Sequence, residues 1–403
     1  MIVGVVKETF PGERRVALVP GVLPSITKAG AEVIVEAGAG LEAGFPDQEY
    51  EEKGAKVVSD RAEIFKSADI VCMIRTSGAN PEKGTGDLEL YRKDQVLIGL
   101  SEPLTEPEPI RKIAATGARL FALELIPRTT RGQAMDVLSS QATVAGYKAV
   151  ALATDTLAKM FPLMMTAAGT IKPAKVFVLG AGVAGLQAIA SAKRAGAVVH
   201  AFDVRPEVKE QVESLGGKFV EIEVADARGE GGYARELTDE EKKKQQELMA
   251  ETIAESDVVI TTAAVPGKKA PMLIPADVAR RMRPGALIVD MAAERGGNCE
   301  LSKPDETVVE NGVTILGPTN MAATIPYHAS QMFAKNVANL LALIIKEGRL
   351  ELDMEDEIIV GTLETDGGEI IHKMAREIFG LPPLASAEAD ARAEEAVTEG
   401  SKA

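Results

Sequence analysis

Histidine and cysteine, which supply most acid–base, thiolate and soft-metal chemistry, are scarce in this sequence. Its 403 residues include three histidines and two cysteines. Cys72 and Cys299 fit neither a disulfide framework nor a metal-site spacing, so we expect no metal and a reducing environment such as the cytoplasm. His200, His328 and His372 fall in a strand, at a helix start and near the C-terminus, and we interpret them as structural.

The sequence also lacks an excess of positive charge and an apolar stretch that could span a membrane. Sixty acidic residues against 45 basic ones give a net charge of −15, which disfavours nucleic acid or an anionic membrane surface as the main partner. The uncharged stretches 176–192 and 311–334 contain glycines and, in the second, Pro318 and Pro326, which a lipid-exposed helix does not tolerate. The first residues have the pattern of a short strand followed directly by charged residues, so we expect neither a signal peptide nor direct membrane insertion.

The sequence alternates short apolar runs with helical patterns, and its length suits two domains. The expected strands of the N-terminal region are 2–6, 33–36, 70–74, 96–100 and 120–123, with helices at 20–29, 47–53, 59–66 and 108–116. Those of the following region are 176–179, 198–202, 218–221, 258–261, 287–290 and 313–316. This alternation predicts an α/β fold of two Rossmann-like, doubly wound parallel-sheet domains.

Two long helical patterns, 135–165 and 321–345, are expected to join the domains. In the first we interpret Met160, Leu163, Met164 and Met165 as core residues. The predicted domains are 1–135 with 326–380, forming the first, and 136–325, forming the second; an Ala- and Glu-rich tail, 381–403, is expected to be disordered. The cleft between the domains is the expected active site.

The most informative motif follows an apolar run of strand length. Gly180, Gly182 and Gly185 have GxGxxG spacing and lead into an Ala-rich helical pattern, and Asp203 ends the next apolar run about twenty residues later. These glycines permit a tight turn, close approach of a pyrophosphate and helix–strand packing, and the helix start binds phosphates. Asp203 suits an adenosine ribose and disfavours a 2′-phosphate, although Arg205 could hold one. The motif predicts an NAD(H) site.

A polar loop, 124–141, precedes the first long helix and contains Arg, Gln and Asp but no His, Cys or Lys. A nicotinamide carboxamide needs hydrogen-bond donors and acceptors, which Arg128, Asp136 and Ser139 can supply. The alternative is structural, with Asp136 as a helix cap that pairs with an exposed arginine. A second unusual segment, between Glu221 and Ser256, is far longer than a normal strand–helix connection; it is either a solvated excursion or a mobile contact loop.

Several motifs together resemble the NAD(H)-binding component, domain I, of proton-translocating nicotinamide nucleotide transhydrogenases. They are the loop 124–141, the glycine motif with Lys172–Val176 before it, and the segments 201–205, 231–234, 260–267 and 296–299. The resemblance covers nearly the whole chain up to about residue 380. A more distant resemblance is to alanine dehydrogenase, which shares the fold and the opening segment from Lys7 to Pro20.

The resemblance implies reversible, Re/Si-specific hydride transfer between NAD(H) on this chain and NADP(H) on a partner component, coupled to proton translocation. Such a transfer requires aligned rings rather than an acid or a base. It implies NADP(H)-binding and membrane-spanning partner subunits, a homodimer of this component, and a peripheral location on the cytoplasmic face of the membrane.

The resemblance also assigns roles to individual residues. Arg128, Gln133 and Asp136 are expected to be catalytic by positioning the nicotinamide, and Tyr233 is expected on a mobile loop that closes over the nucleotide. The full expected cofactor-binding set is Arg128, Thr129, Thr130, Arg131, Gln133, Asp136, Ser139, Gly180, Gly182, Val183, Gly185, Asp203, Val204, Arg205, Gly232, Tyr233, Thr262 and Ala264.

Two alternatives stay open. An alanine-dehydrogenase-like enzyme would need a lysine and a histidine for its oxo acid, but this sequence has Arg75 and a Ser101-Glu102 pair at the corresponding places, and only Arg15 remains. Arginine does not readily deprotonate, and a glutamate is not the same proton donor near neutral pH. The other alternative is a non-catalytic NADH-binding module, which would dock to a partner without transferring hydride.

Overall fold

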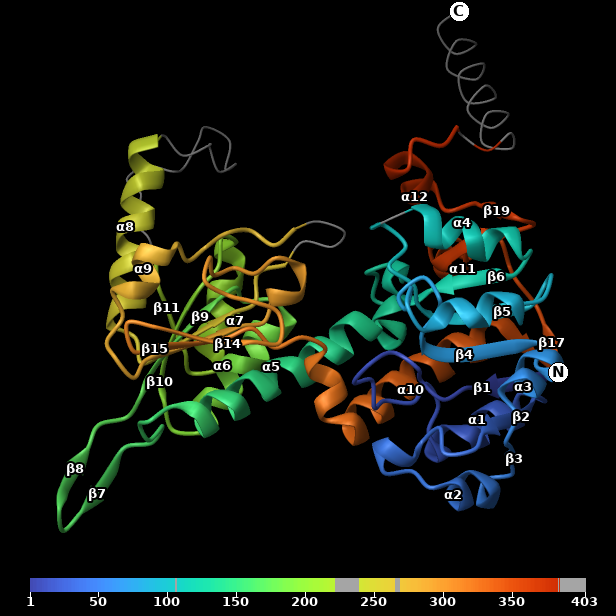
Figure 1. Cartoon of the computed structure of the whole chain (residues 1–403), viewed down its shortest axis with the longest axis horizontal. Coiled ribbons are helices and arrows are strands. Elements are labelled where there is room, and N and C mark those ends of the chain that lie inside the picture. Colours follow the sequence, from blue (N-terminus) through green and yellow to red (C-terminus); the bar gives the residue numbers. More distant parts are fainter. Residues whose placement is uncertain (106, 222–238, 265–268, 383, 385–403) are drawn as a thin grey trace, which may run out of the picture. The chain divides into compact units, whose positions relative to one another are not determined.

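The structure is a computed structural model that describes residues 1–105, 107–221, 239–264, 269–382 and 384, with the side chains of 239–245 left aside (Figure 1). The chain divides into two compact units, Met1–Gln141 with the chain from Ile325 onward (unit 1) and Ala142–Thr324 (unit 2). The sequence placed the corresponding domain boundaries at 135/136 and 325/326. Most of the predicted tail lies outside the described residues.

Unit 1 is built on an eight-stranded sheet with the order β19-β18-β6-β5-β4-β1-β2-β3. Its strands are β1 Ile2–Val5, β2 Glu32–Glu36, β3 Lys56–Val58, β4 Ile70–Arg75, β5 Val96–Leu100, β6 Arg119–Ala122, β18 Leu363–Asp366 and β19 Glu369–Ile370. The first six are parallel, and β18 joins β6 antiparallel. Since both faces are covered, central strands such as β4 consist almost entirely of buried apolar residues.

Helices cover both faces of this sheet. They are α1 Leu23–Lys28, α2 Asp47–Glu52, α3 Arg61–Ser67, α4 Pro107–Ala115, α10 Pro326–Ile344, α11 Glu357–Thr362 and α12 Lys373–Ile378. Side chains of α1, α10 and α11 share one core with the sheet, and those of α3, α4 and α12 share the other. Phe333 on α10 and Phe65 on α3 are fully buried in these two cores.

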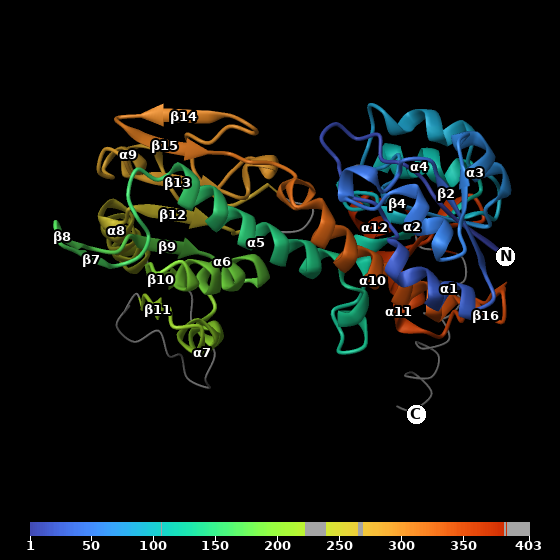
Figure 2. The same ribbon diagram turned by 90° about the horizontal axis from the view of Figure 1, so that it is seen from below.

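Unit 2 contains a seven-stranded sheet with the order β11-β10-β9-β12-β13-β15-β14 (Figure 2). Its strands are β9 Lys175–Leu179, β10 Val198–Phe202, β11 Lys218–Phe219, β12 Val258–Thr261, β13 Leu287–Asp290, β14 Thr307–Glu310 and β15 Val313–Leu316. Its helices are α5 Val137–Thr156, which begins in unit 1, α6 Val183–Arg194, α7 Lys209–Ser214, α8 Asp239–Glu255 and α9 Ala276–Arg280. Residues of α5, α6 and α7 pack on one face, and residues of α8 and α9 on the other.

Both sheets reverse their strand order at one point. In unit 1 the chain runs outward through β1, β2 and β3 and then returns to the other side of β1 as β4. In unit 2 it runs through β9, β10 and β11 and returns to the other side of β9 as β12. In open α/β sheets, ligands bind beyond the carboxyl ends of the strands at this switch point.

The predicted α/β class and the two parallel sheets are confirmed, but the predicted helix over 135–165 is wrong in its second half. Helix α5 ends at Thr156, and the chain then forms a hairpin of β7 (Met164–Thr166) and β8 (Gly169–Ile171), which projects from unit 2 (Figure 1). Phe161 turns into the core of unit 2, and Pro162 cannot donate the hydrogen bond that a continuing helix requires.

The hairpin also corrects an expectation about burial. The side chains predicted to be core are exposed, by 44% for Met160, 58% for Leu163, 37% for Met164 and 80% for Met165. Elsewhere in the described chain, no helix combines the length and the apolar character that crossing a membrane requires.

Candidate functional site

The three predicted glycines form the tight loop between β9 and α6. Gly180 has φ +98°, a left-handed conformation that a side chain would strain, and a Cβ there would lie 2.6 Å from the Thr262 hydroxyl. A Cβ on Gly185 would lie 1.9 Å from the Gly180 carbonyl oxygen, so helix and strand touch through their backbones. A Cβ on Gly182 would meet no described atom within 4 Å. That glycine therefore borders open space.

The start of α6 is available to an anion. Gly182 is the N-cap, and no described side chain caps the helix. The first N–H groups of an α-helix have no partner within the helix, and the helix dipole makes this end positive. Val183 in the first turn is 45% exposed, which leaves this end accessible.

Asp203 lies at the end of β10, beside the glycine loop. Its carboxylate accepts hydrogen bonds from the Ala181 backbone N–H (2.7 Å), from the Arg205 backbone N–H (2.9 Å) and from the Arg205 guanidinium (3.0 and 3.1 Å). Burial alone would raise the pKa of Asp203, but the hydrogen bonds from Arg205 and Ala181 outweigh it and lower the pKa below its usual value. The group is therefore an ionised acceptor next to the loop, and Val204 after it is 81% exposed.

The loop after β12 completes this end of the sheet. The Thr262 hydroxyl donates to the Gly180 carbonyl (3.0 Å), so the two loops at the switch point are bonded to each other. Ala264 is exposed and is the last described residue before a gap. The expected residues Gly180, Gly182, Val183, Gly185, Asp203, Val204, Arg205, Thr262 and Ala264 thus meet at one edge of unit 2, whereas Gly232 and Tyr233 lie outside the described residues.

Sequence reasoning missed the residues that support this loop from behind. The Asn298 amide accepts from the Ala263 N–H (3.1 Å) and donates to the Ala263 carbonyl (2.8 Å). The Asp290 carboxylate, at the end of β13, accepts hydrogen bonds from the Asn298 backbone N–H (2.9 Å) and from the Thr261 hydroxyl (2.9 Å). A polar residue at the end of a buried strand was the available signal, because such ends gather at the ligand edge.

Of the remaining expected residues of unit 1, Ser139 lies in the first turn of α5, and the others, Arg128, Thr129, Thr130, Arg131, Gln133 and Asp136, belong to the loop between β6 and α5. Its centre is a short 3-10 helix, η5, formed by Gly132–Met135. Arg131 and Gln133 are exposed, while Gly132 and Met135 are buried. The loop therefore presents polar groups outward from a buried base.

Asp136 has the geometry of a helix cap. Its carboxylate accepts the Ser139 N–H (2.9 Å) and the Ser139 hydroxyl (2.6 Å), which satisfies free donors at the start of α5. The expected pairing of Asp136 with an arginine is replaced by another ion pair of this loop: Arg131 binds Asp356 at the start of α11. The loop is thus ordered both by its own cap and by a neighbouring helix.

The switch point of unit 1 is occupied by charged side chains of the chain itself. Glu13, whose side chain is fully buried, accepts two hydrogen bonds from the Arg15 guanidinium, both of 2.7 Å, and lies 3.5 Å from Arg75 Nε. The Arg75 guanidinium stacks 4.1 Å from the Phe10 ring centroid. Burial opposes the charge, but Arg15 and then Arg75 hold the pKa of Glu13 below its usual value.

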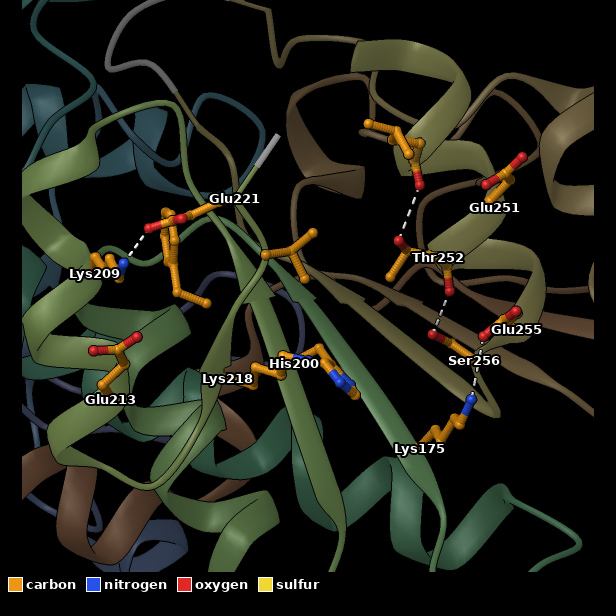
Figure 3. Close-up of a pocket in the computed structure, with 13 residues that line it drawn as sticks. Lys175, His200, Lys209, Glu213, Lys218, Glu221, Glu251, Thr252, Glu255 and Ser256 are labelled. Carbon is orange, nitrogen blue, oxygen red and sulfur yellow. Dashed lines mark hydrogen bonds and ion pairs between the residues drawn. The ribbon is translucent and has the colours of Figure 1, made fainter. Parts of the chain in front are cut away.

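One cavity of unit 2 lies away from the glycine loop. Its volume is about 610 Å³, and it lies between β10, β11 and helices α7 and α8, with Lys218 and His200 on the sheet side and Glu251, Thr252 and Glu255 on α8 opposite (Figure 3). Lys175 pairs with Glu255 across it at 3.2 Å. None of the expected cofactor-binding residues is among those that line it, so volume alone does not identify the site.

Comparison with known proteins places these features in a family. Residues 4–145 match the family model described as alanine dehydrogenase/PNT, N-terminal domain, and residues 149–373 match its C-terminal domain. An NAD(P) transhydrogenase subunit alpha protein of Rhodospirillum rubrum is 44% identical over 377 residues, which cover 92% of this chain and 98% of that protein. A crystal structure of transhydrogenase from Sinorhizobium meliloti matches with a TM-score of 0.83 at 44% identity, covering 92% of this chain and 100% of that one.

Alanine dehydrogenase of Bacillus subtilis is more distant, at 26% identity over 388 residues, which cover 94% of this chain and 95% of that protein. The family expected from the motifs is therefore confirmed. Both halves of the chain match its models, and the identity to transhydrogenase alpha subunits exceeds the identity to alanine dehydrogenase. This chain belongs to the alanine dehydrogenase/PNT family, as a homologue of NAD(P) transhydrogenase subunit alpha.

Proposed function

We propose that this chain is the NAD(H)-binding subunit of a Re/Si-specific, proton-translocating NAD(P)⁺ transhydrogenase. It would transfer hydride reversibly between its own NAD(H) and NADP(H) on a partner component. One observation carries the proposal: the glycine loop, the uncapped start of α6 and the ionised Asp203 meet at the switch point of unit 2. This is the arrangement that binds a pyrophosphate and an adenosine ribose.

The choice of NAD(H) over NADP(H) rests on Asp203. Its carboxylate is ionised and adjacent to the loop, so a ribose 2′-hydroxyl finds an acceptor and a 2′-phosphate meets a like charge. Arg205, the residue that could hold a 2′-phosphate, already donates two side-chain hydrogen bonds to Asp203. Both residues therefore favour the cofactor without the phosphate.

The proposed chemistry needs alignment and no proton transfer, because hydride passes directly between two nicotinamide rings. Arg128, Gln133 and Asp136 are proposed to position the reacting ring, and Ser139 to hold Asp136 through the two bonds of the helix cap. Arg128 and Gln133 are exposed on an ordered loop, as such a role requires. Most of the advantage would come from proximity and orientation.

The names of the relatives support the proposed partners. This chain covers 98% of the Rhodospirillum rubrum protein, whereas the subunit alpha of Haemophilus influenzae, 42% identical, is longer, so that this chain covers 72% of it. We propose NADP(H)-binding and membrane-spanning subunits on other chains, and a peripheral position on the cytoplasmic face through them. A homodimer is supported by the projecting β7–β8 hairpin, where Leu163 and Met165 expose apolar surface that a second copy would cover. Replacing both with glutamate should then yield a monomer in analytical ultracentrifugation.

The decisive experiment mixes the purified chain with the NADP(H)-binding partner component and follows hydride transfer from NADPH to an NAD analogue by absorbance. We expect transfer only with both components present. NADH binding without any transfer would instead establish the non-catalytic module. A parallel reaction with pyruvate, ammonia and NADH should give no alanine, because no lysine or histidine stands where that reaction would require them; measurable alanine would reverse the assignment.

A further inference from the structure

Two asparagines of α10 hold the turn that carries Gln133. The side-chain amides of Asn336 and Asn339 both donate to the carbonyl oxygen of Ala134, at 2.9 and 2.7 Å. The two asparagines are three residues apart, so they lie on the same side of the helix. A carbonyl oxygen has two lone pairs, and these two donors use both.

The opposite side of the turn is held by close backbone contact. A Cβ on Gly132 would lie 2.0 Å from the Pro127 carbonyl oxygen, and a Cβ on Gly361 of α11 would lie 2.5 Å from Pro127 Cγ. The turn therefore rests directly on Pro127, and Pro127 rests directly on α11. The Gly132–Met135 turn is confined between two helices of unit 1.

The start of α11 adds two polar contacts at the edge of the turn. Asp356 pairs with Arg131, and Glu357 accepts a hydrogen bond from the Thr129 hydroxyl at 3.1 Å. Asp356 also caps α11 by accepting the Ile358 N–H at 2.8 Å, so this anchor is itself fixed. These contacts restrain the residues before Gln133, whereas the asparagines restrain the residue after it.

Gln133 depends on this support. Its side chain is exposed, and no described hydrogen bond involves the side-chain amide, so the direction of the side chain is set by the backbone on either side. Hydride transfer needs reacting atoms about 3–3.5 Å apart and aligned. Groups that position a reacting ring must be held to within about 0.5 Å, which normally requires supporting contacts behind them.

Asn336 provides a second indication that the contact is functional. It lies on the buried face of α10 among apolar residues such as Phe333, Val337 and Leu340. Its donor reaches Ala134, but its Oδ1 is buried and has no hydrogen-bond partner among the described residues. A buried acceptor without a partner is destabilising, so an apolar residue would pack this position better unless the donor is needed.

We infer that Asn336 and Asn339 are positioning residues for hydride transfer, acting through the Ala134 carbonyl to aim Gln133. The inference rests on the proposed function and adds residues to it that do not touch the cofactor. It separates two roles. The glycine loop of unit 2 holds the dinucleotide, and α10 positions Gln133, which orients the nicotinamide ring.

The test compares the full-length chain with the variants Asn336→Ala, Asn339→Ala and Asn336→Ala/Asn339→Ala, each with the partner component. Single-turnover hydride transfer should fall about 3-fold in either single variant, because one donor remains, and at least about 30-fold in the double variant. The NADH Kd should change less than 2-fold throughout. Gln331→Ala, an exposed residue of the same helix, is the matched control and should transfer at the unmodified rate.

Amide hydrogen exchange across residues 127–136 gives a readout independent of activity, and it should rise in the double variant only. Gly361→Ala perturbs the turn from the other side, because its methyl group would push Pro127. If the double variant does not fold, Gly361→Ala supplies the test: it should slow hydride transfer and leave the NADH Kd unchanged. Absence of transfer in the unmodified chain overturns both the proposed function and this inference. Normal transfer with a double variant equal to the control, or equal losses in rate and NADH affinity, overturns this inference alone.

Discussion

The two sheets share one architecture and differ at the place where their strand order reverses. In unit 2 this place is bordered by glycines, an uncapped helix and one carboxylate at the edge. In unit 1 the same place is filled by Glu13 and by Arg15 and Arg75, which both pair with it. The comparison teaches that a doubly wound sheet offers a location for a ligand, while the residues at its strand ends decide whether the location stays open.

The difference extends to how each unit treats buried charge. Unit 1 encloses carboxyl groups whose pKa is raised by burial, to about 7 for Glu124 and about 8 for Glu364. In unit 2, Asp203 keeps a lowered pKa because hydrogen bonds outweigh its burial. These carboxyl groups of unit 1, and its buried Glu13 with a lowered pKa, interact inside the fold, whereas the ionised carboxylate of unit 2 lies where a ligand is expected.

The largest effect should come from opening the filled switch point. Glu13→Ala leaves the buried guanidiniums of Arg15 and Arg75 without their shared carboxylate, which should lower the free energy of unfolding by about 3–5 kcal/mol. NADH affinity of the folded protein should be unchanged. Chemical denaturation followed by circular dichroism measures the loss.

The neighbouring pair Arg14–Glu42 supplies a matched control for that substitution. Its side chains are 49% and 56% exposed and 3.8 Å apart, so Glu42→Ala should cost less than about 1 kcal/mol. Similar losses in the two variants would mean that burial of the Glu13 cluster is not what makes it important.

The open switch point should respond to side chains in a different way. Gly182→Ala adds a methyl group that meets no described atom, so the melting temperature should stay the same. NADH should nevertheless bind about 100-fold more weakly, a loss of about 2.7 kcal/mol, because the methyl occupies the space that a pyrophosphate needs. Calorimetric titration and thermal melting measure the two quantities on one sample.

Gly185→Ala is the counterpart of that variant. Its Cβ would lie 1.9 Å from the Gly180 carbonyl oxygen, so both the melting temperature and the NADH affinity should fall. If Gly182→Ala also lowered the melting temperature, the loop would be a packing element, and the contrast between the two switch points would lose its basis.

The third effect concerns pH. Burial raises the pKa of Glu364 to about 8, and Glu124 adds to the shift; neither oxygen of Glu364 accepts a hydrogen bond in the described chain, and His372 lies 3.9 Å away. The folded state thus binds a proton that the unfolded state releases near pH 4.5. Stability should therefore fall as the pH rises from about 4.5 through about 8 and level off above.

Glu364→Gln removes this titration while keeping the shape of the side chain. The variant should match the unmodified protein at pH 4 and exceed its stability by about 2 kcal/mol at pH 8, a value that allows for relaxation around the charge. Denaturant titrations at a series of pH values measure the slope. An unchanged slope would show that Glu364 is already hydrated in the folded protein.

The strands and the glycine loop could be predicted because their signals are local. Strand β5 was expected at 96–100 and is observed at Val96–Leu100, since a short β-branched run between polar turns has few alternatives. The same local reasoning failed over 157–165, where an Ala-, Leu- and Met-rich pattern suits a helix but the packing of Phe161 decides the path. A periodic pattern cannot reveal which of its residues the rest of the fold will bury.

The supporting residues could not be predicted for a related reason. Asn336 and Ala134 are 202 residues apart, and no spacing rule connects them before the fold is known. The local hint was a pair of asparagines, three residues apart, among the buried apolar residues of α10. Asp290 and Asn298 are similar, since their bonds to the β12 loop depend on strand order, which the sequence specifies only through the whole sheet.

The smallest effect tests whether the carboxylate of unit 2 truly differs from those of unit 1 by facing a ligand. Asp203→Asn keeps the size of the side chain and one acceptor for the Ala181 N–H but removes the charge. NADH affinity should fall about 10-fold, about 1.4 kcal/mol, because hydrogen bonds to charged groups are stronger than neutral ones.

The ratio of NADH to NADPH affinity gives the sharper reading of the same substitution. It should narrow in Asp203→Asn, because the charge that repels a 2′-phosphate is gone and the Arg205 guanidinium loses its two side-chain bonds to an ionised partner. Arg205→Ala should then separate the two contributions, since it removes the group that a 2′-phosphate would use and leaves Asp203 ionised. If neither variant changes this affinity ratio, Asp203 forms hydrogen bonds only within the chain and does not contact the ribose. The switch point of unit 2 would then, like that of unit 1, use its charged side chains for internal contacts.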